Sequence, residues 1–226
     1  MATRAIETRE TARATPRETA GRSDSRARRY DPAETRARVL AAAYMLFSSK
    51  GFAATGTADI AREADVSEGS IFYHFGSKQK LLEELGRRHG ELMIAYMQGD
   101  DALEDLEPGI IVPRVFEFVR ANSMWEGMTG ETSQANARTK LMKSADVEPF
   151  YHAAKDTVVE WVERHMTAAF AKRGIKGIEI DLAASFTHHF VGEAIDRIFA
   201  TDDVEEQLRV ERETIRFMRA ACLYEA

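Results

Sequence analysis

The residues best suited to chemistry lie between positions 66 and 78, in the run Val-Ser-Glu-Gly-Ser-Ile-Phe-Tyr-His-Phe-Gly-Ser-Lys. Small residues near the start of a helix allow close approach to another molecule, and polar side chains along one face can bond to phosphates or base edges. Lys78 adds a cation at the start of the next helix, where the helix N-terminus also favours an anion. This order of residue types predicts a helix that enters the major groove of DNA.

Helical periodicity surrounds this run and would position it. Apolar residues recur at helical spacing before it, and the signals around them divide the region into three short helices and the start of a fourth. We expect the third helix to run from its cap at Ser67 to about His74, after a turn that Asp65 can make in the left-handed conformation. In chain order, the start, stop and turn signals are Asp31-Pro32, Gly51, Thr55-Gly56, Asp65-Val66, Ser67 and Ser77.

After Lys78 the apolar residues keep a period of about 3.6 almost to the end of the chain. Beyond a break at 99–109, we expect a helix that begins or kinks at Pro113, then a loop at 126–132 and a short helix up to Leu141. A long helix opens at Pro149 and closes at Gly174, and two last helices span roughly 179–200 and 203–223. No strand pattern occurs, so the sequence predicts an all-α protein with about nine helices.

Charge is divided unevenly along the 226 residues. Residues 1–82 contain 14 Lys and Arg against 10 Asp and Glu, whereas the remaining 144 contain 17 against 27. This asymmetry favours a basic DNA-facing end and an acidic body that phosphate repels, although acidic helical domains are also common. Residues 1–29 hold 8 Arg and 4 acidic residues and lack an apolar period, so we expect disorder there. The segment is either a basic arm for DNA or a leader without a role.

The remaining composition is typical of a cytoplasmic protein. A single cysteine, Cys222, excludes an internal disulfide and fits a reducing compartment. No apolar run approaches the roughly 18 residues that span a bilayer, and the N-terminus has no apolar signal region. We therefore expect a cytoplasmic location.

The first 82 residues resemble the TetR family of bacterial transcriptional regulators over about positions 35–82. The match rests on many positions in the correct order. They are Ala42-Ala43, Leu46-Phe47, Gly51-Phe52, Asp59-Ile60-Ala61, Val66-Ser67, Gly69, Ile71-Phe72-Tyr73-His74-Phe75, Ser77-Lys78 and Leu81. The rest of the chain is similar only in the number and length of its helices.

The resemblance implies an N-terminal helix-turn-helix domain and a larger helical domain for effector binding and dimerisation. With these roles, the expected division is a disordered arm at 1–30, a DNA-binding domain at 31–80 and an effector-binding domain at 81–226. A homodimer would read a palindromic operator with half-sites roughly 34–36 Å apart, and a small molecule would release it, which makes a repressor the expected function. The resemblance assigns DNA contacts to Thr55, Thr57, Glu68, Gly69, Ser70, Phe72, Tyr73, His74 and Lys78.

Three positions depart from the usual family pattern. Phe72 lies where a tyrosine is usual, so a phosphate-donating hydroxyl is missing there. Gly56 replaces a Thr or Ser of the second helix, and Asp65 replaces a turn glycine. Glu68 is a candidate base reader because a carboxylate can accept a hydrogen bond from the cytosine amino group.

Candidates for the effector pocket and the dimer interface come from the C-terminal helices. Effector pockets are mostly apolar with a few polar groups, although a core role is open for each residue named here. For ligand binding the candidates are Phe116, Met124, Trp125, Trp161, His165, Phe186 and His189. For a four-helix dimer interface they are Gly192, Ile195, Ile198 and Phe199.

Other function classes are less well supported. Adjacent His188 and His189 point about 100° apart on a helix, and no metal-binding motif or cofactor fingerprint occurs, so we expect neither a metal nor a cofactor. No phosphate loop, GxSxG motif or set acid pair indicates an enzyme. An architectural DNA-binding protein without an effector stays open, and a sizeable cavity would argue against it.

Overall fold

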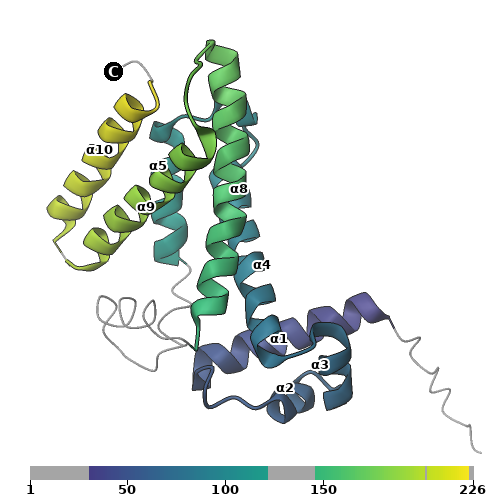
Figure 1. Ribbon diagram of the computed structural model, residues 1–226. Coiled ribbons are helices and arrows are strands. Elements are labelled where there is room, and N and C mark those ends of the chain that lie inside the picture. Colours follow the sequence, from purple (N-terminus) through teal and green to yellow (C-terminus); the bar gives the residue numbers. More distant parts are fainter. Residues whose placement is uncertain (1–30, 122–145, 202, 224–226) are drawn as a thin grey trace, which may run out of the picture. The chain divides into compact units, whose positions relative to one another are not determined.

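The computed structural model describes residues 31–121, 146–201 and 203–223. Within these ranges all regular structure is helical, as Figure 1 shows. Residues from Pro32 onward form one compact unit. The helices are α1 (Pro32–Lys50), α2 (Thr57–Glu63), α3 (Glu68–Phe75), α4 (Lys78–Gln98), a 3-10 turn η1 (Leu103–Asp105), α5 (Pro108–Ala121), α8 (Glu148–Arg173), α9 (Ile180–Phe199) and α10 (Val204–Ala221).

Local signals in the sequence set the boundaries of the first helices. The Ser67 hydroxyl accepts a hydrogen bond from the backbone N–H of Ser70, and the Ser77 hydroxyl accepts one from that of Lys80, so each serine caps the helix that follows it. Gly51 ends α1 with a φ of 83°, and Asp65 takes the left-handed conformation between α2 and α3 with a φ of 51°. The predicted helix-turn-helix is confirmed in the described residues.

Two hydrophobic cores divide the unit. The first lies among α1, α2, α3 and the beginning of α4, and includes the fully buried Phe47, Ile60, Ile71 and Leu82. The second joins the end of α4 to α5, α8, α9 and α10 around Phe116, Trp161 and Ile198. The division between the cores therefore falls inside α4, whereas the sequence placed a domain boundary at residue 80.

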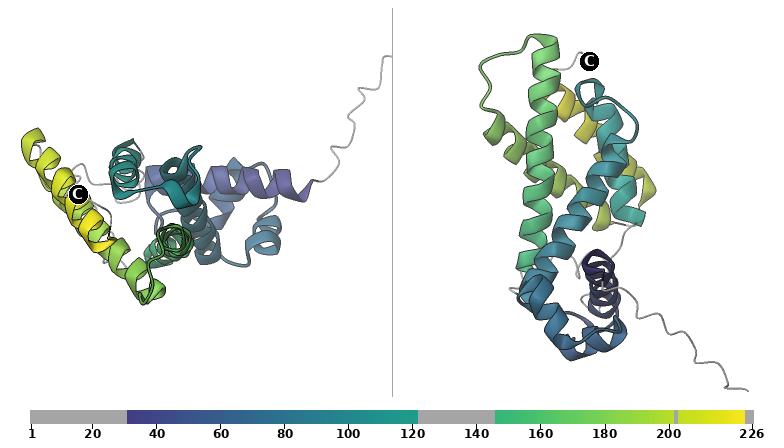
Figure 2. Two further views of the ribbon diagram at one scale, coloured as in Figure 1. Left: turned by 90° about the horizontal axis from the view of Figure 1, so that it is seen from above. Right: turned by 90° about the vertical axis from the view of Figure 1, so that its right-hand side faces the viewer.

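Helices α4 and α8 pack side by side, as Figure 2 shows. Each of them contributes residues to both cores. Their backbones come close at Gly86, where an added Cβ would lie 2.1 Å from the carbonyl oxygen of Phe150. Phe150 and Val147, from the start of α8, belong to the first core, although the rest of α8 packs in the second. A shift of α8 would therefore displace residues of the first core, which supports α3.

The other predicted elements agree with the structure in part. Helix α8 has Pro149 in its first turn and ends at Gly174, which is left-handed, as expected. Helix α5 begins at Pro108 and carries Pro113 inside it, so of the two predicted alternatives the start at Pro113 does not hold. The predicted loop at 126–132 and short helix to Leu141 lie outside the described residues. None of the described helices has the length and apolar character needed to cross a membrane.

Candidate DNA-binding surface and ligand cavity

The outer face of α3 presents polar and aromatic side chains to solvent. Tyr73 is 80% exposed and Phe72 is 49% exposed, although aromatic side chains are usually buried. Gly69 has open space around it, since an added Cβ would meet only the Ser67 hydroxyl at 3.8 Å. The inner face of α3 carries Ile71 and Phe75 into the first core. The helix is thus held from within and leaves a face free for another molecule.

Hydrogen bonds fix the start of α3 against α2. The Thr57 hydroxyl donates to a carboxylate oxygen of Glu68, and the hydroxyls of Ser67 and Ser70 lie 2.9 Å apart. These bonds orient Glu68 and Ser70 at the N-terminal end of α3, which is the part of a recognition helix that reaches base edges. An oriented carboxylate suits specific readout better than general attraction to phosphate.

Two residues assigned to DNA have internal roles. Thr55 is only 1% exposed, and its hydroxyl donates to the carbonyl oxygen of Gly51 at 2.8 Å. The Lys78 ammonium donates to the carbonyl oxygens of Phe52 and Thr55 at 2.9 and 3.0 Å, and it lies over the Phe52 ring. The assignment of the Thr55 side chain is therefore wrong, because burial removes it from any partner. Lys78 mainly ties the start of α4 to the loop before α2.

An ion-pair network braces the C-terminal end of α3. Arg36 of α1 donates to the carbonyl oxygen of His74 at 3.0 Å and pairs with Glu84 of α4 at 2.9 Å. Glu84 is buried and also pairs with Arg87 and Arg88 of its own helix. One carboxylate thereby links α4 through Arg36 to the backbone of α3.

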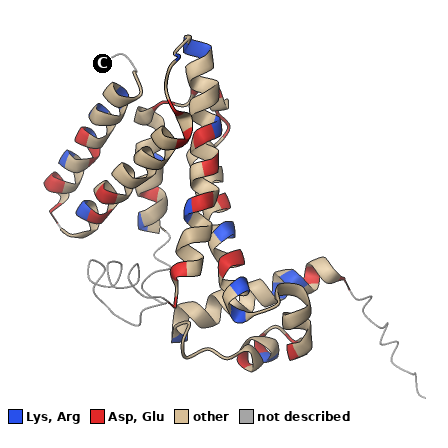
Figure 3. Ribbon diagram, viewed as in Figure 1, with Lys and Arg blue, Asp and Glu red and all other residues tan. Residues whose placement is uncertain are grey.

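Charge on the described helix-turn-helix is balanced, and Figure 3 shows cations and anions mixed on these helices. Residues 31–80 contain six Lys or Arg and six Asp or Glu, so the excess of basic residues in the first 82 lies within 1–29. Most of these cations already have partners, whereas the ammonium groups of Lys50 and Lys80 form no hydrogen bond or ion pair with another described residue. Sequence reasoning missed Lys80, which follows Lys78 by two residues in the first turn of α4 and remains exposed there for phosphate.

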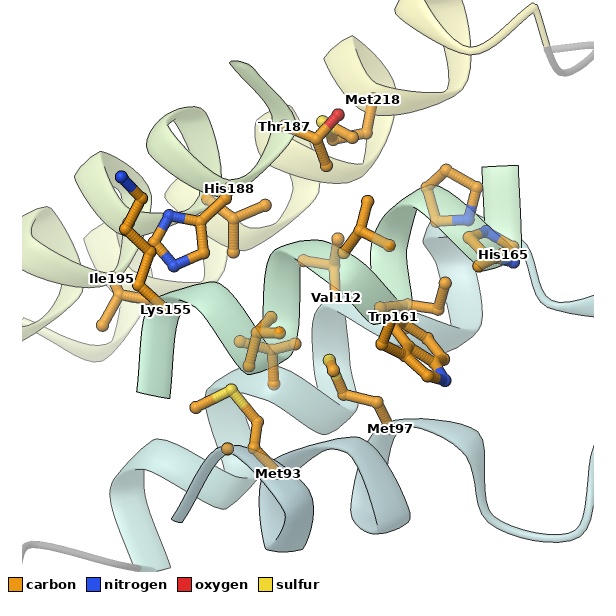
Figure 4. Close-up of a pocket in the computed structure, with 18 of the residues that line it drawn as sticks. Met93, Met97, Val112, Lys155, Trp161, His165, Thr187, His188, Ile195 and Met218 are labelled. Carbon is orange, nitrogen blue, oxygen red and sulfur yellow. The ribbon is translucent and has the colours of Figure 1, made fainter. Parts of the chain in front are cut away.

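A cavity of about 160 Å³ opens inside the second core, shown in Figure 4. Apolar side chains from α4, α5, α8, α9 and α10 form most of its wall, including Met93, Met97, Val112, Val158, Ile195 and Met218. Four basic side chains also line it, namely His89, Lys155, His165 and His188. No Asp or Glu occurs among its described lining residues, although the C-terminal part of the chain is acidic.

The polar groups of the cavity differ in how they are satisfied. His165 bonds through Nδ1 to the carbonyl oxygen of Leu103 at 2.8 Å and stacks on Trp161, whose indole N–H donates to Gln98. His188, by contrast, has a buried Nδ1 with no hydrogen-bond partner among the described residues. Burial lowers the pKa of His188 to about 4, with smaller lowering contributions from His189 and Lys155 and an opposing one from Asp156. Burial alone lowers the pKa of His89 to about 4.

The predicted ligand residues are only partly brought together. Trp161 and His165 line the cavity. Phe116 is buried in the second core outside the cavity lining, Phe186 is 68% exposed, and the exposed His189 bonds to the Ser185 carbonyl oxygen. The structure therefore does not place these three residues on the wall of this cavity. Met124 and Trp125 lie outside the described residues. His89, Lys155 and His188 were missed, because their meeting depends on how α4, α8 and α9 pack.

The predicted dimer residues mostly face the interior of their own chain. Ile195 and Ile198 are buried in the second core, and Gly192 and Ile195 line the cavity, so they are not available to a partner; Phe199 is partly buried against the same core. The exposed apolar side chains of α9 lie on another face, at Leu182 and Phe186. Phe190 follows at the same spacing and stacks on the half-exposed Phe217 of α10, with ring centroids 4.2 Å apart. These four residues form what we call the α9–α10 apolar patch.

Comparison with known proteins supports the reading of the N-terminal helices. Residues 39–85 match the family described as bacterial regulatory proteins of the tetR family. The chain is 40% identical over 72 residues to the HTH-type transcriptional regulator TtgR of Pseudomonas putida, and 47% identical over 55 residues to YvkB of Bacillus subtilis. These matches cover 30% and 24% of this chain and 34% and 29% of the relatives, so the chain matches about a third of their length.

The fold similarity extends over most of the chain. The solved structure of GusR from Salmonella enterica aligns with 84% of this chain and 98% of its own, with a TM-score of 0.58 and 18% identity. At that identity the likeness concerns the fold alone. Among the described residues, no group of three or more His, Cys, Asp or Glu side chains is arranged to hold a metal ion.

Proposed function

We propose that the chain is a sequence-specific DNA-binding repressor, because its residues 39–85 match the TetR family of bacterial regulatory proteins. In this proposal α3 enters the major groove of a palindromic operator as one half of a homodimer, and a small molecule in the cavity releases the protein. The observation that carries the proposal is the solvent-facing side of α3. It exposes Tyr73 and Phe72 and holds Glu68 by a hydrogen bond, while the opposite side of the helix is buried in the first core.

The expected contacts follow from that face. Glu68 and Ser70, at the start of α3, are placed for base edges, and Gly69 leaves room for close backbone approach. Tyr73 and His74 follow on the same helix for phosphate or base contacts, and Lys80 supplies a phosphate contact in place of Thr55. Phe72 contributes apolar contact with sugar or a thymine methyl group.

The cavity and α3 are linked through α4 and α8. Helix α8 contributes Lys155, Val158 and Trp161 to the cavity and Phe150 to the first core, and α4 contributes Met93 and Met97 to the cavity and Glu84 to the network behind α3. A ligand that moves either helix would therefore change the position of α3 relative to the other subunit.

The α9–α10 apolar patch is the proposed dimer surface. Exposed aromatic residues gathered on one face commonly mark a protein interface, and a two-fold interface needs such a patch to face its own copy. Phe186→Glu should shift the protein from dimer to monomer in light scattering and leave the helical circular dichroism unchanged. Leu223→Glu, at an exposed apolar site outside the patch, is the control; a dimer that survives Phe186→Glu contradicts this surface.

The test of function is selection of bound sequences from a pool of random duplex DNA at a stated salt concentration. We expect one palindrome to be enriched, with binding lost in a Ser70→Ala/Tyr73→Ala variant that remains folded. Enrichment of no sequence, or equal binding by the double variant, would contradict the proposal.

An architectural DNA-binding protein is the second candidate, and balanced charge on residues 31–80 does not favour it. Binding without sequence preference depends on many phosphate contacts. The lined cavity also has no purpose in such a protein. Salt-sensitive binding of all duplexes alike in the selection would support it.

A further inference from the structure

The two ends of the cavity differ in a way that bears on its ligand. At one end, the indole of Trp161 and the imidazole of His165 have hydrogen-bond partners within the protein. At the other end, Lys155 of α8 and His188 of α9 lie together, as Figure 4 shows. The Lys155 charge contributes to the lowered pKa of His188, which places the two groups within electrostatic reach.

The groups at the second end lack partners within the described chain. The buried Nδ1 of His188 has no hydrogen bond there, and the partly buried ammonium of Lys155 has neither a hydrogen bond nor an ion pair with any described residue. Leaving a polar group unpaired in a protein interior is unfavourable, so each such group calls for a structural or functional explanation. Native ion pairs are abundant elsewhere on the same helices, for example between Lys172 and Asp105.

The sign of the missing partner follows from the lining. Lys155 is basic, and no described lining residue is an acid; Asp156, whose charge also acts on His188, is exposed and lies outside the lining. The rest of the wall is apolar, with Met93, Met97 and Val112 between the two ends. A ligand that satisfies this wall has an apolar body and one anionic group.

The volume limits the size of that body. At about 160 Å³, the cavity is close to engineered cavities of roughly 150 Å³ that accept benzene, and it is smaller than most drug-sized pockets. One ring or a short alkyl chain fits this space.

We propose that the effector is a compact apolar monocarboxylate whose carboxylate binds between Lys155 and His188 and whose body extends along Met93 and Met97 toward Trp161. Lys155 supplies the charge, and His188 donates an N–H to one carboxylate oxygen. This inference rests on the proposed function, because it names the chemistry of the effector. It also explains why an acidic domain keeps one cation unpaired against an apolar cavity.

The test uses three flexible probes of equal chain length, namely octanoate, 1-octanol and octylammonium. Isothermal titration of the full-length protein without DNA measures the dissociation constant of each. We expect octanoate to bind at least tenfold more tightly than 1-octanol, and octylammonium to bind most weakly. Equal affinity for acid and alcohol, tighter binding of the amine, or binding of none of the three would overturn the proposal.

Substitutions test which residues cause the preference for octanoate over 1-octanol. Lys155→Met should weaken octanoate binding at least tenfold and leave 1-octanol within twofold, since it removes the charge and keeps the apolar stem. His188→Leu should weaken octanoate binding about threefold to tenfold and strengthen that of 1-octanol. Lys176→Met, at an exposed lysine outside the cavity lining, is the matched control. If Lys155→Met weakens acid and alcohol equally, or no more than Lys176→Met does, the carboxylate site is wrong.

These outcomes separate this inference from the proposed function. The titrations contain no DNA, so a selective carboxylate site would stand even if the duplex selection enriched nothing. Enrichment of a palindrome together with absent octanoate selectivity would overturn the effector chemistry alone. Unchanged melting temperatures of the variants confirm that any loss of binding is local.

Discussion

The two hydrophobic cores of this chain differ in where their available polar groups lie. The helices of the first core present theirs to solvent, through Tyr73 and Glu68 on the exposed face of α3. The second core has a polar group facing inward, because the Nδ1 of His188 beside the cavity has no hydrogen-bond partner among the described residues. The first core thus supports the proposed DNA-binding surface and the second contains the proposed effector cavity, while α4 and α8 contribute residues to both cores.

A fall in pH should give the largest difference in stability between the two cores. The pKa of His89 and that of His188 lie at about 4 in the folded protein, against 6.5 in the unfolded chain. Between these values the unfolded state binds more protons, so stability is full above about pH 6.5 and is lost as pH falls toward 4. From pH 7 to pH 5 we expect a loss of about 2 kcal/mol per histidine, measured by urea unfolding without ligand. A His89→Phe/His188→Leu variant should lose most of this dependence; an unchanged slope would contradict the assignment.

The close contact between α4 and α8 at Gly86 should tolerate no added volume. In Gly86→Ala the new Cβ would meet the backbone of Phe150 at 2.1 Å, and backbone cannot move aside cheaply. We expect a loss of about 3 kcal/mol in unfolding free energy. Gly192→Ala is the control, because no atom lies within 4 Å of its added Cβ, and replacing a helical glycine should be neutral or stabilising by about 0.5–1 kcal/mol. Equal effects of the two changes would show that the helices are not in close contact.

The ion-pair network at the C-terminal end of α3 should depend on one buried carboxylate, that of Glu84. Glu84→Gln removes the partner of Arg36 and of two further arginines, all of which are partly exposed and can return to water. We expect a loss of about 2 kcal/mol in stability and weaker operator binding, because Arg36 also holds the His74 carbonyl. Glu91→Gln, whose exposed carboxylate pairs with Arg87 alone among the described residues, should cost less than about 0.5 kcal/mol. Similar losses in both variants would remove the special role of Glu84.

The smallest change in free energy is expected on the exposed face of α3. Tyr73→Ala should leave the melting temperature unchanged, since the side chain is 80% exposed, and should weaken operator binding by about tenfold, or roughly 1.4 kcal/mol. Tyr44→Ala on α1, another exposed tyrosine, should leave binding within twofold. Fluorescence anisotropy with a labelled operator measures both, and an equal loss from the two changes would place the contact elsewhere.

The sequence predicted what depends on neighbouring residues. Ser67 and Ser77 cap their helices, Asp65 makes the left-handed turn and Gly174 ends α8, because each of these signals acts within a few residues. The residue pattern of the same region also predicted the resemblance to the TetR family, which the match over residues 39–85 supports.

The sequence could not predict which side of an apolar helix faces a partner. Helix α9 carries apolar residues on two faces, and the prediction assigned the core-facing Ile195 and Ile198 to the dimer and the exposed Phe186 to the ligand. Burial of one face is decided by α8 and α10, which lie far away in the chain. The meeting of Lys155 with His188, and the capture of Lys78 by backbone carbonyl oxygens, depend on tertiary packing in the same way.

The central claim is that occupation of the cavity changes the affinity of α3 for DNA. The most direct measurement is the dissociation constant of the selected operator, taken with and without an octanoate concentration that calorimetry shows to fill the cavity. We predict at least a fivefold weakening in the wild-type protein and less than a twofold change in Lys155→Met. An operator affinity that stays the same while the cavity is filled would contradict the claim.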